Sequence, residues 1–215
     1  MVKLQAFLIS LCALVVSLSA CGQESGFPAR YIEGVHYTKL AQPVATIDSD
    51  KIEVVEVFWY ACGHCYNFEP AIHKYEQSVA GDVNFVRIPA IWQPIMETHA
   101  RIFYTAQQLG ILDDVHQAVF NAIHLNGKTL QTVTEVADLL AQFGADRKAV
   151  VDTFNSGDVT KQLRDDTVKV RGYQITGTPQ LIVQGRYRVE ANRSLVQDDM
   201  LKVVDFLVDQ IRHEQ

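Results

Sequence analysis

Apolar residues in the first half of the chain follow a strand pattern, then a helical pattern, then a strand pattern again. Residues 52–60 are rich in Val, Phe, Trp and Tyr and predict a strand, and residues 83–88 predict a second strand. Residues 62–79, which lie between them, predict a helix. A strand–helix–strand unit of this kind pairs its strands in parallel through a right-handed crossover.

The next stretch, residues 96–171, has a helical pattern and predicts four or five helices of ordinary length. Thr132 and Glu135 have the spacing of a capping box in front of an apolar run. We expect the glycines of this stretch to lie at helix C-terminal ends or in turns. They are Gly110, Gly127, Gly144, Gly157 and Gly172.

The last part of the chain returns to strands and ends in a helix. Residues 180–183 and 186–189 predict a hairpin around Gln184-Gly185, and residues 196–212 predict an amphipathic helix. The complete order of elements predicts an α/β fold with a central mixed sheet and an inserted all-helical subdomain.

Composition indicates a folded protein and argues against nucleic-acid binding. The chain has 215 residues, of which 48% are hydrophobic and 20% charged, enough for one well-packed domain with a sizeable insertion. The formal net charge is −6, and the sequence contains no basic run or stripe. We therefore expect no nucleic-acid partner.

The first twenty residues have the order of a secretory signal peptide. Lys3 is followed by an almost entirely apolar stretch, residues 4–18, and then by Ser19 and Ala20. An uncleaved membrane anchor is the weaker interpretation, because spanning a bilayer takes roughly 20 apolar residues. We therefore predict export, with residues 1–20 as the signal peptide.

The end of this segment, Leu18-Ser19-Ala20-Cys21, resembles the lipobox of bacterial lipoproteins. In that family the cysteine sulfur is lipidated and the cysteine becomes the new N-terminus. Ordinary cleavage after Ala20 would instead leave an unpaired cysteine exposed in an oxidising compartment. We expect lipidation of Cys21, with residues 21–30 as a polar tether to the folded domain.

The main chemical motif is Cys62-Gly63-His64-Cys65, at the predicted junction of a strand and a helix. A structural zinc site needs four ligands, and no second cysteine pair exists in the mature chain, so we expect no metal and no cofactor. An inert structural disulfide is also disfavoured, because closing so short a loop stabilises a fold very little. A redox-active disulfide between Cys62 and Cys65 is the better interpretation.

The position of the motif assigns different roles to the two sulfurs. Free N–H groups and the positive end of the helix dipole stabilise a thiolate at Cys62, and His64 can add charge or a hydrogen bond. Cys65 lies one turn deeper in the helix and should be less exposed. We therefore predict that Cys62 is the attacking and accepting sulfur in disulfide exchange, and that Cys65 is the sulfur that resolves the mixed disulfide. A stabilised thiolate favours the reduced protein, so the disulfide should be an oxidant.

Glu56 interrupts an otherwise apolar strand six residues before Cys62. A parallel strand that is covered on both faces should be uniformly apolar, so a carboxylate there is costly. Burial near Cys65 would suggest a role in proton transfer. The alternative is that Glu56 points to solvent.

Several features together resemble the DsbA-type disulfide oxidases of the thioredoxin-fold superfamily, over nearly all of the mature chain. They include residues 31–37 with Leu40, Glu56, and Gly177-Thr178-Pro179 ahead of an apolar strand. The helical stretch of residues 96–171, here called the helical block, also lies where that family has its insertion. The dipeptide between the cysteines departs from the Pro-His of the best-known members and is similar to that of protein disulfide isomerases, which leaves the strength of the oxidant open.

This resemblance implies a thioredoxin-like domain formed by residues 31–92 and 172–215, with residues 93–171 as its helical insertion. It implies that Pro179 is cis and faces the sulfurs, and that Gly63, Thr178 and Pro179 contact the client. The backbone of Thr178 would pair with an extended client peptide by strand addition.

The partners implied are folding exported proteins with free thiols and a DsbB-like, quinone-linked membrane oxidase that restores the disulfide. We expect a monomer in the periplasm, anchored to a membrane if Cys21 carries lipid. Two alternatives stay open. One is an isomerase or reductant of exported disulfides, and the other is a redox-inert peptide-binding module.

The remaining rings and histidines suggest no second site. We expect core packing for Trp59, Tyr60 and Trp92, with the lining of a client groove as the alternative. Most of the other histidines should be solvated on helices or loops; they are His36, His73, His99, His116, His124 and His213.

Overall fold

The computed structural model describes residues 30–214, so the predicted signal peptide, Cys21 and most of the tether lie outside the described residues. The strands are β1 (Thr38–Lys39), β2 (Ile52–Phe58), β3 (Val83–Pro89), β4 (Gln180–Val183) and β5 (Tyr187–Val189). The α-helices are α1 (Gly63–Ser78), α2 (Pro94–Gln108), α3 (Leu112–His124), α4 (Val133–Leu140), α5 (Arg147–Phe154), α6 (Gly157–Gly172) and α7 (Met200–Glu214). In this part of the chain no helix has the length and apolar character needed to cross a lipid bilayer.

The strands form one mixed sheet in the order β1-β5-β4-β2-β3. β2 and β3 pair in parallel, with Glu56 opposite Arg87, and the other neighbours pair antiparallel. This confirms the predicted parallel pair and the late hairpin. The turn of the hairpin is Gln184-Gly185, and both residues have positive φ, as tight hairpin turns require. β1 is two residues long and was not predicted.

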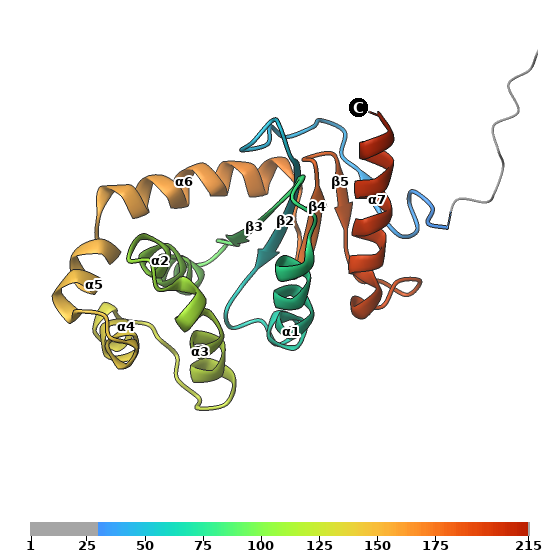
Figure 1. Ribbon diagram of the computed structural model, residues 1–215. Coiled ribbons are helices and arrows are strands. Elements are labelled where there is room, and N and C mark those ends of the chain that lie inside the picture. Colours follow the sequence, from blue (N-terminus) through green and yellow to red (C-terminus); the bar gives the residue numbers. More distant parts are fainter. Residues whose placement is uncertain (1–29, 215) are drawn as a thin grey trace, which may run out of the picture. The chain divides into compact units, whose positions relative to one another are not determined.

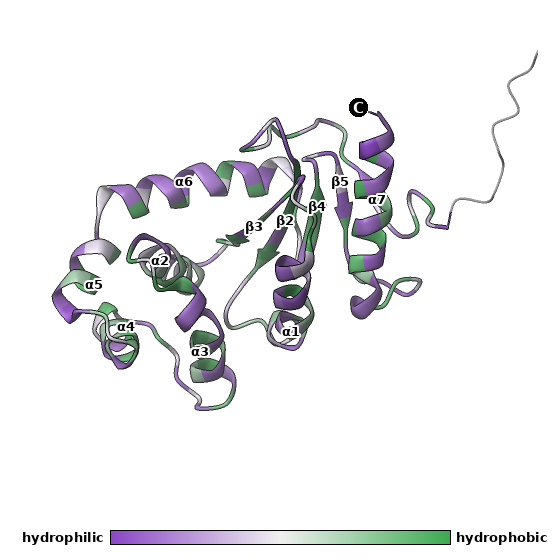
Figure 2. Ribbon diagram, in the orientation of Figure 1, coloured by the Kyte–Doolittle hydropathy of each residue, from purple (hydrophilic) through white to green (hydrophobic). Residues whose placement is uncertain are grey.

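Helices cover both faces of the sheet. α1 and α7 lie side by side on one face, where Phe68, Ile72 and Leu207 pack against Val54 and Leu181 (Figure 1). On the other face, the C-terminal part of α6 and the start of α2 pack on alternate residues of β2 and β4. Because both faces are covered, β2 and β4 are mostly apolar, as their colouring in Figure 2 shows.

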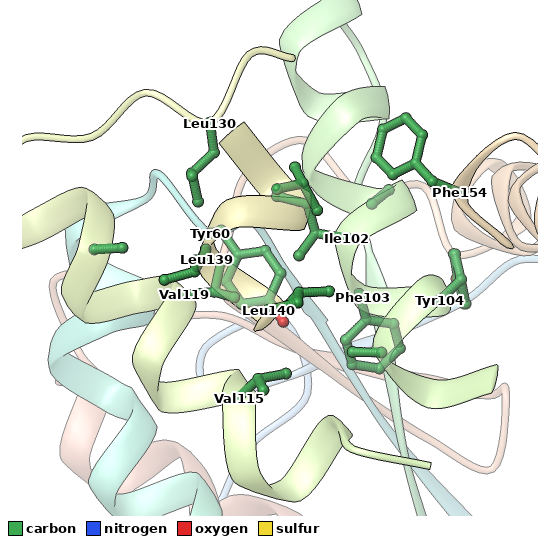
Figure 3. Close-up of a cluster of buried hydrophobic side chains, with 14 of the residues drawn as sticks. Tyr60, Ile102, Phe103, Tyr104, Val115, Val119, Leu130, Leu139, Leu140 and Phe154 are labelled. Atoms are coloured by element: carbon green, nitrogen blue, oxygen red, sulfur yellow. The ribbon is translucent and has the colours of Figure 1, made fainter. Parts of the chain in front are cut away.

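Helices α2 to α6 form a second apolar core beyond the edge strand β3. Its members come from all five helices and include Ile102, Phe103, Val119, Leu140 and Phe154 (Figure 3). Phe58 and Tyr60, from the end of β2 and the loop that follows, insert into this core. The helical block is therefore packed directly onto the chain segment that leads into Cys62.

Local sequence signals account for several helix ends. Thr132 caps α4, and its reciprocal bonds with Glu135 confirm the capping box. Gly110, Gly127 and Gly144 adopt positive φ where helices end, as expected. Gly157 was placed wrongly, since it is the first residue of α6.

The reason is the residue before it: the Ser156 side chain accepts the Val159 N–H and caps α6. The closing helix also differs from its prediction, because a short 3₁₀ turn, η2 (Gln197–Asp199), precedes the start of α7 at Met200. Trp92 was expected in the core and is 47% exposed.

Candidate active site

Cys62 lies between the end of β2 and the first turn of α1. It is the N-cap residue of α1, with φ −81° and ψ 115°, and its sulfur accepts the N–H of Cys65 at 3.3 Å. Its own N–H donates to the carbonyl of Trp59 at 3.0 Å. The half-buried sulfur of Cys62 therefore occupies the place where a helix offers unpaired N–H groups to an anion.

These contacts lower the pKa of the Cys62 thiol to about 5. The largest cause is a hydrogen bond from the Cys65 side chain, and further bonds come from the side chain of Thr178 and from the backbone N–H groups of Cys65 and His64. Burial acts in the opposite direction and is outweighed. The sequence predicted this direction, but the stabilising group of His64 is its backbone N–H, while its side chain is exposed.

Cys65 is placed so that it stays a thiol. It is 0% exposed and packs with the core of the helical block. Burial is the largest cause of a strongly raised pKa at Cys65, and its hydrogen bond to Cys62 and the charge on that sulfur add to the effect. The two cysteines therefore differ sharply in acidity, although only two residues separate them.

The loop before β4 faces the Cys62 sulfur. The Thr178–Pro179 bond is cis, as expected, and the Cys62 thiol donates to the carbonyl of Thr178 at 3.3 Å. Residues from 176 to 180 line a pocket beside His64, together with Glu190 and residues 195–197. Gly63, the first residue of α1, has open space around its Cα. Of the predicted contact residues, Thr178 lies beside the Cys62 sulfur, Pro179 follows it through the cis bond, and Gly63 is next to Cys62 in the chain.

Glu56 is buried and does not reach solvent, being 1% exposed. By strand alternation it lies on the same face of β2 as Val54, the face that α1 covers. Burial raises the pKa of Glu56 to about 8, against a smaller lowering by the charge of Arg87. When Glu56 is ionised, its charge raises the pKa of Cys65. Glu56 is therefore mostly protonated at neutral pH and electrostatically coupled to the resolving sulfur.

Sequence reasoning missed the ionic cluster around Glu56. The guanidinium of Arg87 is buried and lies 3.7 Å from Glu56, 3.2 Å from Glu69 and 3.0 Å from Glu76. A signal was present: Glu69 follows Cys65 by four residues, so both lie on the same buried face of α1. Arg87 could be identified only after strand register placed it opposite Glu56.

The expectation for the histidines was wrong for two of them. His99 and His116 are 2% and 4% exposed, because both pack against the aromatic segment before Cys62. Tyr60 is buried as expected, and Trp59 is half-buried. Within residues 30–214, no group of three or more His, Cys, Asp or Glu side chains is arranged to hold a metal ion.

The arrangement provides a stabilised thiolate at the surface, a neutral buried thiol behind it, and a buried acid that exchanges protons near neutral pH. A thiolate at Cys62 is a nucleophile toward disulfides and a good leaving group from them. The carbonyl of Thr178 lies beside it, where an extended peptide can pair. These groups suit thiol–disulfide exchange with a polypeptide.

The chain is similar in sequence to known proteins over most of its length. Residues 82–202 match the model of the DSBA-like thioredoxin domain. The thiol:disulfide interchange protein DsbA of Pseudomonas aeruginosa is 40% identical over 182 residues, which cover 85% of this chain and 86% of that protein. The protein of the same name from Azotobacter vinelandii is 38% identical over 201 residues, or 93% of this chain and 94% of that protein.

The similarity extends to solved structures. The crystal structure of Pseudomonas aeruginosa DsbA superposes with a TM-score of 0.82 at 39% identity, over 86% of this chain and 96% of that chain. The oxidoreductase DsbA from Xylella fastidiosa superposes with a TM-score of 0.80 at 30% identity, over 85% and 98%. The thioredoxin-like sheet and the helices packed against it are thus common to this chain and these structures.

The acidity of Cys62 can be measured on the reduced protein by the rate of its alkylation. We expect the rate to rise with pH through a midpoint near pH 5 and to level off only above it, because the thiolate is the reactive form and the pKa is about 5. Cys62→Ser is the control, since the buried thiol of Cys65 should then stay unlabelled across this range. A midpoint above pH 8 contradicts the assignment.

Replacing Glu56 with Gln should change how stability depends on pH. The pKa of Glu56 in the folded protein, about 8, is raised above its unfolded value, about 4.5. Between these two values the folded state holds a proton that the unfolded state releases, so this group lowers stability as pH rises. The free energy of unfolding of Glu56→Gln minus that of the parent should therefore increase by roughly 3 kcal/mol from pH 5 to pH 8.

Denaturant unfolding of both dithiol proteins at each pH gives this difference. Taking the difference removes the contribution of His99 and His116, whose lowered pKa values make stability rise with pH up to the unfolded pKa. A difference that stays flat across the range would mean that Glu56 is not a buried titrating acid.

Proposed function

The chain belongs to the DsbA-like thioredoxin-domain family, and from that premise we propose that it donates the Cys62–Cys65 disulfide to exported client proteins. It is a thiol:disulfide oxidoreductase, as its relatives are. The observation that carries the proposed direction is the hydrogen bonding of the Cys62 sulfur at the start of α1. These bonds favour the form with a free thiolate, so the disulfide gives up its oxidising equivalents readily.

The reaction has two exchange steps. In the first, a client thiolate attacks the sulfur of Cys62, a client–Cys62 bond forms, and the Cys62–Cys65 bond breaks with its electron pair left on Cys65. In the second, another client thiolate attacks the client sulfur of the mixed disulfide and releases Cys62 as a thiolate. The client gains one disulfide. This chain takes up two electrons and is left with a thiolate at Cys62 and, once Cys65 is protonated, a thiol at Cys65.

Glu56 suits the role of proton donor in the first step. Cys65 leaves as a thiolate in surroundings that strongly disfavour its charge, so it must take up a proton as the bond breaks. The carboxyl of Glu56 is buried, protonated at neutral pH and coupled to Cys65. Proton transfer from Glu56 would shift the negative charge toward Arg87, which lies 3.7 Å away.

We propose that the client binds as an extended strand along the loop before β4. The support is the open position of Gly63 and the carbonyl of Thr178, which lies 3.3 Å from the attacking sulfur. Main-chain bonds demand little of the client's sequence. This suits an enzyme whose clients share thiols rather than a sequence motif.

Regeneration and location are further parts of the proposal. A DsbB-like, quinone-linked membrane oxidase would accept the two electrons and restore the disulfide, and the enzyme would act as a monomer in the periplasm. Export rests on the signal pattern of residues 1–20, and anchoring rests on Cys21. Lipid labelling of the full chain in bacterial cells should give an acylated product that Cys21→Ser abolishes. Equal labelling of both would exclude lipidation at that residue.

The direction of the reaction is tested by comparing the stability of the two redox forms. We expect the dithiol protein to unfold at higher denaturant concentration than the disulfide protein, because only the dithiol form has the stabilised thiolate. The same proteins should be equilibrated with glutathione. A disulfide form that is clearly the more stable would contradict the donor role.

Activity assays separate the alternatives. The oxidised protein should introduce disulfides into a reduced client, and Cys62→Ser should abolish this activity. Cys65→Ser has no disulfide to donate; its Cys62 thiolate should instead attack a client that already contains a disulfide and accumulate the mixed disulfide, because no resolving thiol remains. An isomerase would instead repair a scrambled client without any oxidant. A redox-inert binding module would keep its full activity in cells after Cys62→Ser.

A further inference from the structure

Three histidines of the helical block contact the two residues that lie just ahead of the redox motif. His99 comes from α2, and His116 and His124 come from α3. Together we call them the histidine clamp. Their partners are Trp59 and Tyr60, which stand three and two residues before Cys62.

His99 holds the side chain of Trp59. The indole N–H of Trp59 donates to Nδ1 of His99 at 3.0 Å, and the rings stack with centroids 6.1 Å apart. Because Nδ1 accepts, the proton of a neutral His99 is on Nε2, which lies 3.0 Å from the carbonyl of Thr129 and donates to it. His99 therefore joins the loop before the motif to the loop between α3 and α4.

His116 holds the hydroxyl of Tyr60 at the bottom of the helical core. The hydroxyl oxygen lies 2.7 Å from Nδ1 of His116, and Tyr60 is enclosed by side chains of the helical block (Figure 3). The other ring nitrogen of His116 is 3.4 Å from Glu69 on α1. This histidine therefore contacts both the loop before the motif and the helix after it.

His124 contacts the chain on both sides of the cysteine pair. Its Nε2 lies 2.8 Å from the carbonyl of Tyr60, to which it donates. Its ring stacks on Tyr66 with a centroid distance of 4.6 Å and an angle of 13°. Tyr66 directly follows Cys65. One side chain from the insertion thus fixes both ends of the segment that contains both sulfurs.

This segment needs an external support. β2 ends at Phe58 and α1 begins at Gly63, so Trp59 to Cys62 belong to neither element. The carbonyl of Trp59 accepts the N–H of Cys62, so a movement of Trp59 moves Cys62. The N–H of Cys65 reaches the Cys62 sulfur at 3.3 Å, and hydrogen bonds weaken steeply with misalignment.

We propose that the histidine clamp positions Cys62 for catalysis, so that the inserted helices set the stability of its thiolate. His99, His116 and His124 touch neither sulfur in this arrangement; they act through Trp59, Tyr60 and Tyr66. The inference rests on the proposed role of Cys62 as the attacking sulfur. It assigns to the helical block a part in the chemistry as well as in packing.

The test separates the effect of the N–H donor of His124 from the effect of its stacked ring. His124→Phe keeps a ring over Tyr66 and loses the N–H to the Tyr60 carbonyl, whereas His124→Gln keeps an N–H donor without the ring. We expect Phe to raise the pKa of Cys62 by about 0.5–1 unit, and so to shift the glutathione equilibrium about 3–10-fold toward the disulfide. Gln should restore most of the parent value.

The pKa is measured from the thiolate absorbance of the reduced protein, with unfolding curves recorded in parallel. His213→Phe, on the exposed end of α7, is the matched control and should leave both quantities unchanged. A His124→Phe protein that loses stability but keeps the parent pKa and equilibrium overturns the proposal. A parent pKa in the ordinary range refutes the proposed function instead, so the two failures are distinguishable.

Trp59→Phe provides a second route in case His124→Phe does not fold. It removes the indole N–H that His99 accepts and leaves an aromatic ring in its half-buried place. The pKa of Cys62 should again rise. If the Trp59→Phe protein folds and its Cys62 titrates as in the parent, the loop before the motif does not need the clamp, and the proposal is wrong.

Discussion

The chemistry of this protein depends on how differently the structure treats two sulfurs that lie one helical turn apart. Cys62 caps α1 and receives hydrogen bonds at its sulfur, whereas Cys65 is enclosed by apolar side chains. The first environment favours an anion and the second excludes one. Opening the disulfide therefore leaves a thiolate in one place only, and this asymmetry gives the exchange reaction its order and its direction.

Because of that asymmetry Cys65 needs a proton when the disulfide opens, and in the proposed mechanism Glu56, from the ionic cluster beneath α1, supplies it. A carboxyl in a strand covered on both faces would ordinarily only lower the stability of the fold. Here Glu56 faces the helix with the two cysteines, and Arg87 from the neighbouring strand lies 3.7 Å away, where it stabilises the carboxylate that forms when Glu56 loses its proton. The parallel register of β2 and β3 brings Glu56 and Arg87 together, so the sheet supplies the ionic groups that lie beneath the two cysteines.

The helical insertion has a closer connection to the site than its place in the sequence suggests. Phe58 and Tyr60 leave the sheet and enter the helical core, and three histidines bind the chain around them. The segment around Cys62 is thus contacted from three directions: the start of α1, the cis-proline loop before β4, and the helical block. Each direction comes from a different part of the chain.

Periodicity, turn residues and cap positions are local properties, so the strand–helix–strand opening, the hairpin, the capping box at Thr132 and the unequal acidity of the two cysteines could be predicted from the sequence alone. The sequence also singled out Glu56, as a charge in an apolar run. Three-dimensional packing was needed to reveal that Arg87 lies opposite Glu56 and that His99 and His116 are buried. Those contacts join residues far apart in sequence, and their energies come from burial and register, which no local pattern contains.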